Sequence, residues 1–136
     1  MGPYLRTNKV SFFQMRFKKY SFEQKILIGK KIKTICKNKK VKLIVNDDPY
    51  LAKKIGADGC HLGQNDMVIQ EARKILRKKI IGITCHNSKK LIRHAVKDGA
   101  SYIAIGAFFK SKTKKINYIA KPSLISWVKR FTKIPV

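Results

Sequence analysis

The chain has 136 residues, of which 44% are hydrophobic, and 32 Lys and Arg against seven Asp and Glu give it a net charge of +25. This hydrophobic fraction excludes a disordered polar chain, and no stretch reaches the roughly 18 apolar residues of a membrane span. This charge has three possible explanations: the chain binds nucleic acid, it binds an anionic small molecule, or its lysines simply face solvent. Because basic residues are scattered along the chain, we expect solvent-facing lysines together with a local anion site.

The predicted elements alternate between strand and helix along the whole chain. A β-rich run at 10–16 precedes a helix that Ser21 opens. Its apolar residues Ile26, Leu27, Ile32 and Ile35 are expected on one side. Further strands are predicted at 41–46, 58–62, 80–84 and 101–106, and helices after Pro49 and at 67–76, 88–97 and 122–131. Residues 134–136 are expected to start another strand. Five strands separated by helices predict an α/β fold with a parallel sheet, either doubly wound or closed into a barrel.

Polar side chains follow the predicted carboxyl end of every strand. They are Gln14, Arg16 and Lys18; Asn46 and Asp47; His61, Gln64, Asn65 and Asp66; Thr84 and His86; and Ser111, Thr113 and Lys114. Parallel α/β folds bind ligands at this edge of the sheet, so we expect one site here. The amide and cationic groups suit phosphate oxygens, and a Mg²⁺ ion would explain two carboxylates among them.

Several of these residues have alternative interpretations. Asp48, followed by Pro49, is expected to cap a helix, and Asp66 is either a metal ligand or the N-cap of the 67–76 helix. His61 is expected either to belong to the core or to support the site from behind by contacting a residue that touches the ligand. Tyr102 is expected to be a packing residue. His86 beside Cys85 does not predict a Cys–His nucleophile, because adjacent strand residues face opposite sides.

The three cysteines, Cys36, Cys60 and Cys85, are odd in number and lack metal-ligand spacing. They predict reduced thiols in a cytoplasmic protein. The chain also lacks the glycine-rich loop of nucleotide hydrolases, so we expect no nucleotide hydrolysis.

Five stretches, "QMRFK", "LIVND", "GADGCHLGQND", "IIGITCHN" and "GASYIAIGAFFKSKTK", resemble the motifs of the thiamine phosphate synthase family in order and spacing. They cover nearly all of residues 12–114, and the run Asp-Gly-x-His-Leu-Gly-Gln-x-Asp is the most specific. The resemblance implies a (β/α)₈ TIM barrel and a Mg²⁺-dependent transferase. Its reaction joins hydroxymethylpyrimidine pyrophosphate to thiazole phosphate, giving thiamine phosphate and pyrophosphate.

The resemblance also implies a role for each site residue. Pyrophosphate would be bound by Gln14, Arg16, Lys18, Asn46 and Lys114, and Mg²⁺ by Asp47 and Asp66. Thr84 stands near the reacting centre where the family usually has serine, and Ser111 and Thr113 match the thiazole-phosphate loop. Arg16, Lys114 and Thr84 are the expected catalytic residues. Two positions of this loop differ from the family, since Ala107 and Lys110 replace its usual prolines. Asp48 stands where the family commonly has an arginine.

The length of the chain is a further departure, since such barrels have roughly 200 residues or more. The motifs align with strands two to six and the start of strand seven, so residues 1–136 are expected to be a single partial TIM-barrel domain and a fragment of a longer gene. A thiazole tautomerase of the same superfamily, an inactive truncated remnant and a basic nucleic-acid-binding module are the alternatives, in that order. We expect small-molecule substrates, no nucleic-acid or membrane partner, and leave a homo-oligomer open.

Overall fold

The computed structural model describes residues 10–110 and 115–136, where strands and helices alternate as the sequence predicts. The strands are β1 (Phe12–Met15), β2 (Lys42–Asn46), β3 (Gly59–Leu62), β4 (Ile80–His86) and β5 (Tyr102–Ile105). The helices are α1 (Phe22–Asn38), α2 (Pro49–Lys54), α3 (Ile69–Leu76), α4 (Lys89–Lys97) and α5 (Pro122–Phe131).

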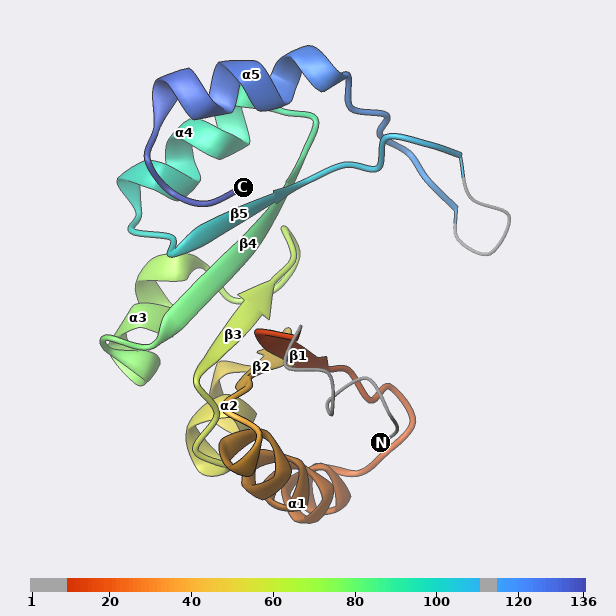
Figure 1. Cartoon of the computed structure of the whole chain (residues 1–136), viewed down its shortest axis with the longest axis vertical. Coiled ribbons are helices and arrows are strands. Elements are labelled where there is room, and N and C mark those ends of the chain that lie inside the picture. Colours follow the sequence, from red (N-terminus) through yellow and green to blue (C-terminus); the bar gives the residue numbers. More distant parts are fainter. Residues whose placement is uncertain (1–9, 111–114) are drawn as a thin grey trace.

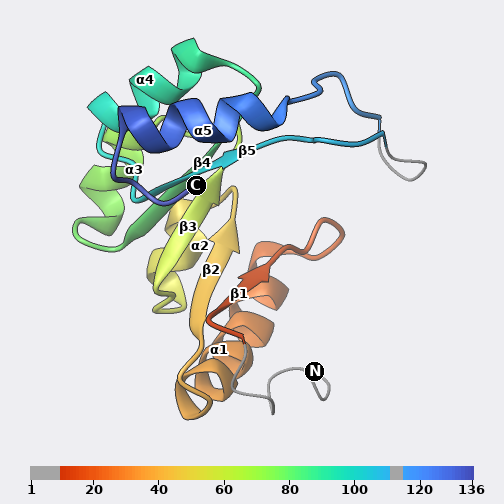
Figure 2. The same cartoon turned by 45° about the horizontal axis from the view of Figure 1, so that its top comes forward.

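The five strands form one parallel sheet in the order β1-β2-β3-β4-β5, which confirms the predicted α/β fold with a parallel sheet. The sheet curves into a half-barrel, with α1 and α2 at one end, α4 and α5 at the other, and α3 between them (Figure 1). Figure 2 shows the arrowheads of β2 and β3 at the same end of the molecule as the long connection that leaves β5. The carboxyl ends of the strands therefore share one edge.

Alternate residues of each strand face opposite sides of the sheet. Leu43, Val45, Cys60, Leu62 and Ile81 belong to the side that the helices cover, and all five are fully buried. The register places Asn46 beside His61 and Thr84 beside Ala104 on the other, concave side. The helix-covered side thus holds the core, and the concave side is left for polar side chains.

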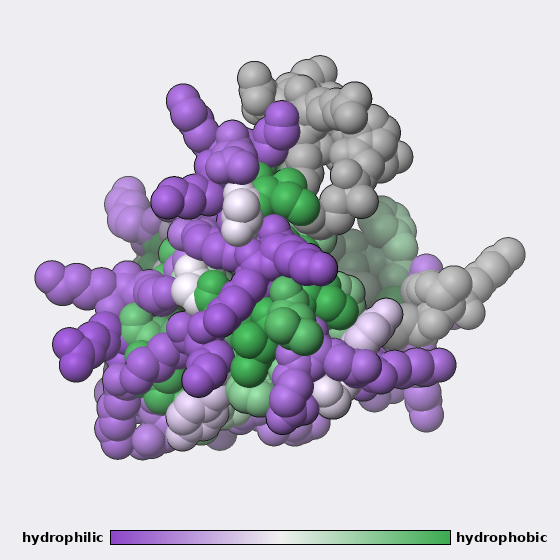
Figure 3. Space-filling view, turned by 90° about the horizontal axis from the view of Figure 1, so that it is seen from below, coloured by the Kyte–Doolittle hydropathy of each residue, from purple (hydrophilic) through white to green (hydrophobic). Residues whose placement is uncertain are grey.

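Helix α1 begins with a capping box, in which the Ser21 hydroxyl accepts a hydrogen bond from the Gln24 N–H and the Gln24 side chain accepts one from the Ser21 N–H. Of the residues predicted to share one side of this helix, Ile32 is buried, whereas Leu27 is 65% exposed and Ile35 is 40% exposed. The helix also buries Gly29 and Cys36, and a Cβ at Gly29 would lie 2.8 Å from the Ile55 side chain. At the α1 and α2 end, hydrophilic side chains surround a compact hydrophobic area (Figure 3).

Helix α2 confirms the capping role of Asp48. Its carboxylate accepts a hydrogen bond of 2.9 Å from the Leu51 N–H, and Pro49 occupies the first turn, where a missing N–H costs nothing. The helix ends before Gly56, whose φ of 69° reverses the chain toward β3.

Most strands and helices begin or end within one or two residues of their predicted bounds, and the last predicted strand is absent from the described residues. Strand β4 continues to His86, and residues 134–136 form no strand, although the Pro135 carbonyl accepts a hydrogen bond of 2.9 Å from the Ile103 N–H of β5. A single bond does not make a ladder, so the predicted strand start was wrong. Within the described ranges, no helix combines the length and the apolar character that crossing a bilayer requires.

Asp58, just before β3, ties α1 to the sheet. Its carboxylate accepts hydrogen bonds from Lys33 Nζ (2.6 Å) and the Leu43 N–H (2.7 Å). Burial raises the pKa of Asp58, but these two hydrogen bonds and the Lys33 charge outweigh it, so the pKa lies below its ordinary value. The ionised carboxylate therefore stabilises the fold.

We expect Asp58→Asn, which keeps an acceptor for the Leu43 N–H, to lower the free energy of unfolding by about 1 kcal/mol at neutral pH, measured by urea denaturation. A lowered folded-state pKa means that this contribution is present above the ordinary pKa of 3.8 and is lost as pH falls through the folded-state pKa. The variant and the parent should therefore converge in acid. Glu71→Gln, which breaks the exposed Glu71–Lys74 pair, is the control and should change little at any pH.

Candidate functional site

The carboxyl edge of the sheet brings together most of the polar residues predicted for the site. Gln14 at the end of β1 and Asn46 at the end of β2 are joined by a hydrogen bond of 3.3 Å from Gln14 Nε2 to Asn46 Oδ1. Arg16 and Lys18 follow β1 with exposed side chains. Parallel pairing places these groups side by side, because Gln14 is in register with Ile44, two residues before Asn46.

Asp47 occupies the turn that leaves β2. Its N–H donates to the His61 carbonyl (2.7 Å), which extends the β2–β3 ladder by one residue. Its φ of 66° lies in the left-handed region, which aspartate tolerates better than most residues. The two adjacent carboxylates therefore have different partners, since Asp48 caps α2 and Asp47 interacts with Asp66.

Asp66 closes the turn that follows β3. Its Oδ2 accepts a hydrogen bond of 2.6 Å from the Gly63 N–H, and a Cβ at Gly63 would lie 2.9 Å from that same oxygen. Glycine therefore leaves room for the carboxylate. The alternative of Asp66 as a helix N-cap was wrong, because α3 begins after Val68, without a side-chain cap, and the carboxylate is committed to its own turn.

The carboxyl groups of Asp47 and Asp66 lie close enough to interact directly. Partial burial raises the pKa of Asp47, and Asp66 raises it further through a hydrogen bond and through charge repulsion. Arg16 and Lys18 oppose this effect and lower the pKa. Two acidic and two basic side chains from three loops thus form one electrostatic cluster.

This pair of carboxylates fits Mg²⁺ better than a transition metal. Among residues 10–110 and 115–136, no group of three or more His, Cys, Asp or Glu side chains could hold a metal ion. Zinc sites need three or four such protein ligands. Magnesium is commonly held by one or two carboxylates, with water and substrate phosphates completing the coordination, and the repulsion between Asp47 and Asp66 is what a divalent cation would relieve.

Thr84 on β4 lies on the concave face and is connected to the sheet interior by hydrogen bonds. His61 Nε2 is 2.9 Å from Thr84 Oγ1, and His61 Nδ1 is 2.7 Å from the Tyr102 hydroxyl. Burial lowers the pKa of His61, and burial raises the pKa of Tyr102 to about 12. Both side chains are therefore neutral at physiological pH. This placement agrees with the expectation that His61 supports the site from behind.

The Tyr102 ring lies across β4 at Gly82, where an added Cβ would overlap three of its ring atoms. Glycine at this position lets the ring reach His61 from two strands away. The sequence predicted Tyr102 only as a packing residue, because register between β3, β4 and β5 is needed to see that it meets His61.

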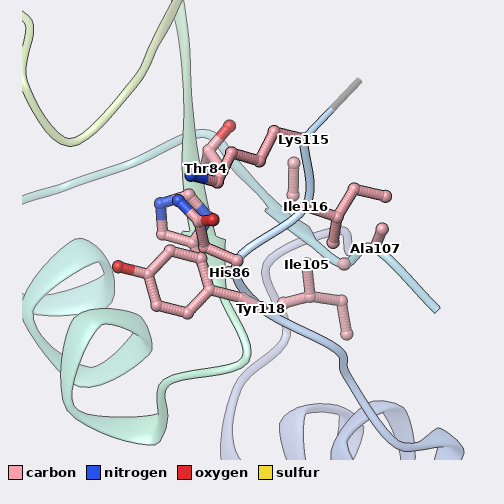
Figure 4. A pocket seen from close by; sticks show the side chains of 10 residues that line it. Thr84, His86, Ile105, Ala107, Lys115, Ile116 and Tyr118 are labelled. Carbon is pink, nitrogen blue, oxygen red and sulfur yellow. The ribbon is translucent and has the colours of Figure 1, made fainter. Parts of the chain in front are cut away.

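A cavity of about 480 Å³ opens beside Thr84 at the end of β4 and β5. His86 and Tyr118 stack there with ring centroids 4.4 Å apart, and Lys115 extends toward Thr84 (Figure 4). A second cavity of about 560 Å³ contains Asp66 and shares His86 and Tyr118 with the first. The stacked pair thus stands between the acidic cluster and Thr84.

Lys115 and Tyr118 belong to the segment after β5 and were not predicted as site residues, because irregular structure has no periodicity to reveal its orientation. The predicted residues Ser111, Thr113 and Lys114 lie outside the described residues.

The cysteines take no part in the site. Cys85, beside His86, is fully buried on the helix-covered side, and burial raises its pKa to about 11. Burial, together with the charges of Asp48, Asp47 and Asp66, raises the pKa of Cys60 to about 12. Neither thiol can supply a thiolate nucleophile at neutral pH.

Comparison with known proteins links this arrangement to one family. A family model described as thiamine monophosphate synthase matches residues 4–136. The thiamine-phosphate synthase of Pelagibacter ubique is 54% identical over 132 residues, which make up 97% of this chain and 64% of that protein. The corresponding protein of Saccharophagus degradans is 40% identical over 93% of this chain and 59% of its own length.

A solved structure agrees with these sequence matches. The thiamine phosphate pyrophosphorylase from Pyrococcus furiosus superposes with a TM-score of 0.83 at 28% identity, over 93% of this chain and 60% of that chain. The chain therefore spans roughly 60% of the length of the relatives it matches.

We expect Gly82→Ala to lower the free energy of unfolding by about 1–3 kcal/mol, because the new methyl group displaces the Tyr102 ring. In a Tyr102→Ala background the same change should be neutral or stabilising by about 0.5 kcal/mol, since alanine then gains over glycine in a strand. Urea denaturation of the four proteins gives the coupling energy. Equal costs in both backgrounds would contradict the placement of the ring over Gly82.

Proposed function

Because the chain belongs to the thiamine monophosphate synthase family, we propose that it catalyses the joining of hydroxymethylpyrimidine pyrophosphate to thiazole phosphate. In this reaction the thiazole ring nitrogen forms a bond to the pyrimidine methylene carbon while the carbon–oxygen bond to pyrophosphate breaks. The bonding electron pair leaves with pyrophosphate, and thiamine phosphate is the other product. The enzyme is then a transferase of thiamine biosynthesis.

We propose further that β1 to β5 are strands two to six of an eight-stranded TIM barrel. Their parallel sequential order and their curvature support this assignment, as does the superposition on 60% of a longer relative. In such barrels the catalytic groups lie at the carboxyl edge of the strands, where the polar cluster of this chain is found.

The single observation that carries the proposed function is the meeting of Arg16, Lys18, Asp47 and Asp66 at this edge. The reaction's main demand is stabilisation of the charge that develops on pyrophosphate as it departs. Arg16 and Lys18 supply fixed positive charge, and the amides of Gln14 and Asn46 supply hydrogen bonds to phosphate oxygens.

In this proposal Asp47 and Asp66 hold Mg²⁺, which when bound would add positive charge beside the pyrophosphate. The two carboxylates come from the ends of β2 and β3, and the turns that hold them are closed by backbone hydrogen bonds. Thr84 presents a hydroxyl to the neighbouring cavity, close to where the pyrimidine would lie. Lys114, Ser111 and Thr113 keep their predicted roles in binding the two phosphates.

The proposed setting is the cytoplasm, with small molecules as the partners. Three buried, unpaired cysteines are consistent with a reducing compartment.

We expect Arg16→Gln to lower kcat/KM for thiamine phosphate formation by about 100-fold or more, because a charge next to the leaving pyrophosphate is removed. Product formation is measured by chromatography and pyrophosphate release by a coupled assay. Arg77→Gln is the matched control, since Arg77 is exposed near the opposite edge of the sheet and should leave the rate unchanged.

Absence of product from both substrates would contradict the synthase assignment. Metal-independent isomerisation of a thiazole phosphate would instead identify the tautomerase alternative, for which the placement of His86 in the cavity beside Thr84 is the favouring observation.

For the metal, we expect Asp66→Asn to weaken Mg²⁺ binding by about tenfold or more, because one of two carboxylate ligands is lost. Calorimetric titration with MgCl₂ in the presence of inorganic pyrophosphate measures this directly, without turnover. Asp98→Asn, at the end of α4, is the control and should bind Mg²⁺ as the parent does. Equal affinity in all three proteins would remove Asp66 from the metal site.

A further inference from the structure

Three side chains on the concave face form a continuous hydrogen-bonded series, of which the proposed chemistry uses only Thr84. The Tyr102 hydroxyl is 2.7 Å from His61 Nδ1, and His61 Nε2 is 2.9 Å from Thr84 Oγ1. The three residues come from β5, β3 and β4. Thr84, at the outer end of the series, is the member that lines the cavity of about 480 Å³.

The direction of donation in this series follows from the number of donors and acceptors. A neutral imidazole has one N–H donor and one bare nitrogen acceptor. In the described part of the chain, the Tyr102 hydroxyl has no hydrogen-bond partner other than His61. If Nδ1 carried the proton, the half-buried Tyr102 O–H would have no acceptor in the described part of the chain, which is unfavourable.

The favoured arrangement therefore has Tyr102 donating to Nδ1 and the proton of the imidazole on Nε2. His61 Nε2–H then donates to Thr84 Oγ1. Because that oxygen is already accepting from His61, the Thr84 O–H is free to point into the cavity as a donor. In the opposite tautomer the Thr84 O–H would be turned back toward Nε2, and the site would lose this donor.

The sheet holds both rings of the series in fixed positions. The Tyr102 ring is seated over Gly82 and stacks against His61 with centroids 5.5 Å apart, so both rings are held in place by the sheet.

We propose that His61, oriented by Tyr102, is a positioning residue that presents the Thr84 hydroxyl as a hydrogen-bond donor to an anionic oxygen of the substrate, namely the pyrophosphate oxygen that takes up charge as it leaves. This assignment rests on the proposed function. It extends the site inward, from the polar edge along the concave face, and assigns a task to a half-buried histidine and tyrosine.

Tyr102→Phe is the sharpest variant, because it removes one oxygen atom and leaves the ring over Gly82. We expect kcat for thiamine phosphate formation to fall about threefold to tenfold with little change in KM, because the donor acts on charge that develops in the transition state. Thr84→Val should lower kcat by at least as much, and Thr84→Ser should restore most of the activity.

The double variant Tyr102→Phe/Thr84→Val separates positioning from a structural role. If Tyr102 and His61 act through Thr84, the double variant should be no slower than Thr84→Val alone. If the two losses multiply, the proposal is overturned. His61→Gln, whose amide can still donate to Thr84, should retain more activity than His61→Leu.

A measurement without turnover tests the direction of donation itself. ¹⁵N NMR of the His61 ring in the full chain should find the proton on Nε2, and a shift toward the Nδ1–H tautomer is expected in Tyr102→Phe. A proton on Nδ1 in the parent protein would overturn the proposal. If the parent makes no thiamine phosphate, the proposed function fails, and the tautomer still decides whether Thr84 is presented as a donor.

Discussion

The parallel pairing of five strands in the order of the sequence is the constraint on which the rest of the structure depends. It brings the carboxyl ends of all strands to one edge, so that residues far apart in the chain become neighbours. It also divides each strand into buried residues beneath the helices and residues on the concave face. Asp58 secures this pairing, since its side chain joins α1 to β2 and its carbonyl accepts a hydrogen bond from β4.

The arrangement of side chains on the concave face depends on a glycine, Gly82, as much as on the polar residues around it. Tyr102 on β5 can reach across β4 to His61 on β3, because Gly82 has no side chain that would occupy the space of the ring. The ring then supports His61, and His61 contacts Thr84 at the mouth of the cavity. Hydrogen bonds therefore connect the cavity at the carboxyl edge to β3 and β5 on the concave face.

Much of the fold and part of the site could be predicted from the sequence. Asp48 and Pro49 identify a helix start by local chemistry alone, and the structure confirms it. The polar residues after each strand could be placed at one edge because parallel topology dictates it. The sequence could not decide whether Asp66 is a helix cap or a site residue, because either kind of residue can stand just before a helix. The hydrogen bond from the Gly63 N–H to the Asp66 carboxylate decides against the cap. Tyr102 was missed because its role depends on register, and Lys115 and Tyr118 because their segment lacks a repeating pattern.

The sequential order of the strands has a consequence for how the chain acquires its structure. Each strand pairs with the one that precedes it, separated only by a single helix and its turns. Pairing neighbours in this way closes shorter loops than pairing strands that lie farther apart in the chain, so it keeps the entropic cost of each closure low. During synthesis, each newly made strand and helix can dock on the edge left by the previous pair, so growth is directional, from amino to carboxyl terminus. The concave face is then the last feature to be completed, because His61 acquires its partner Tyr102 only when β5 has joined.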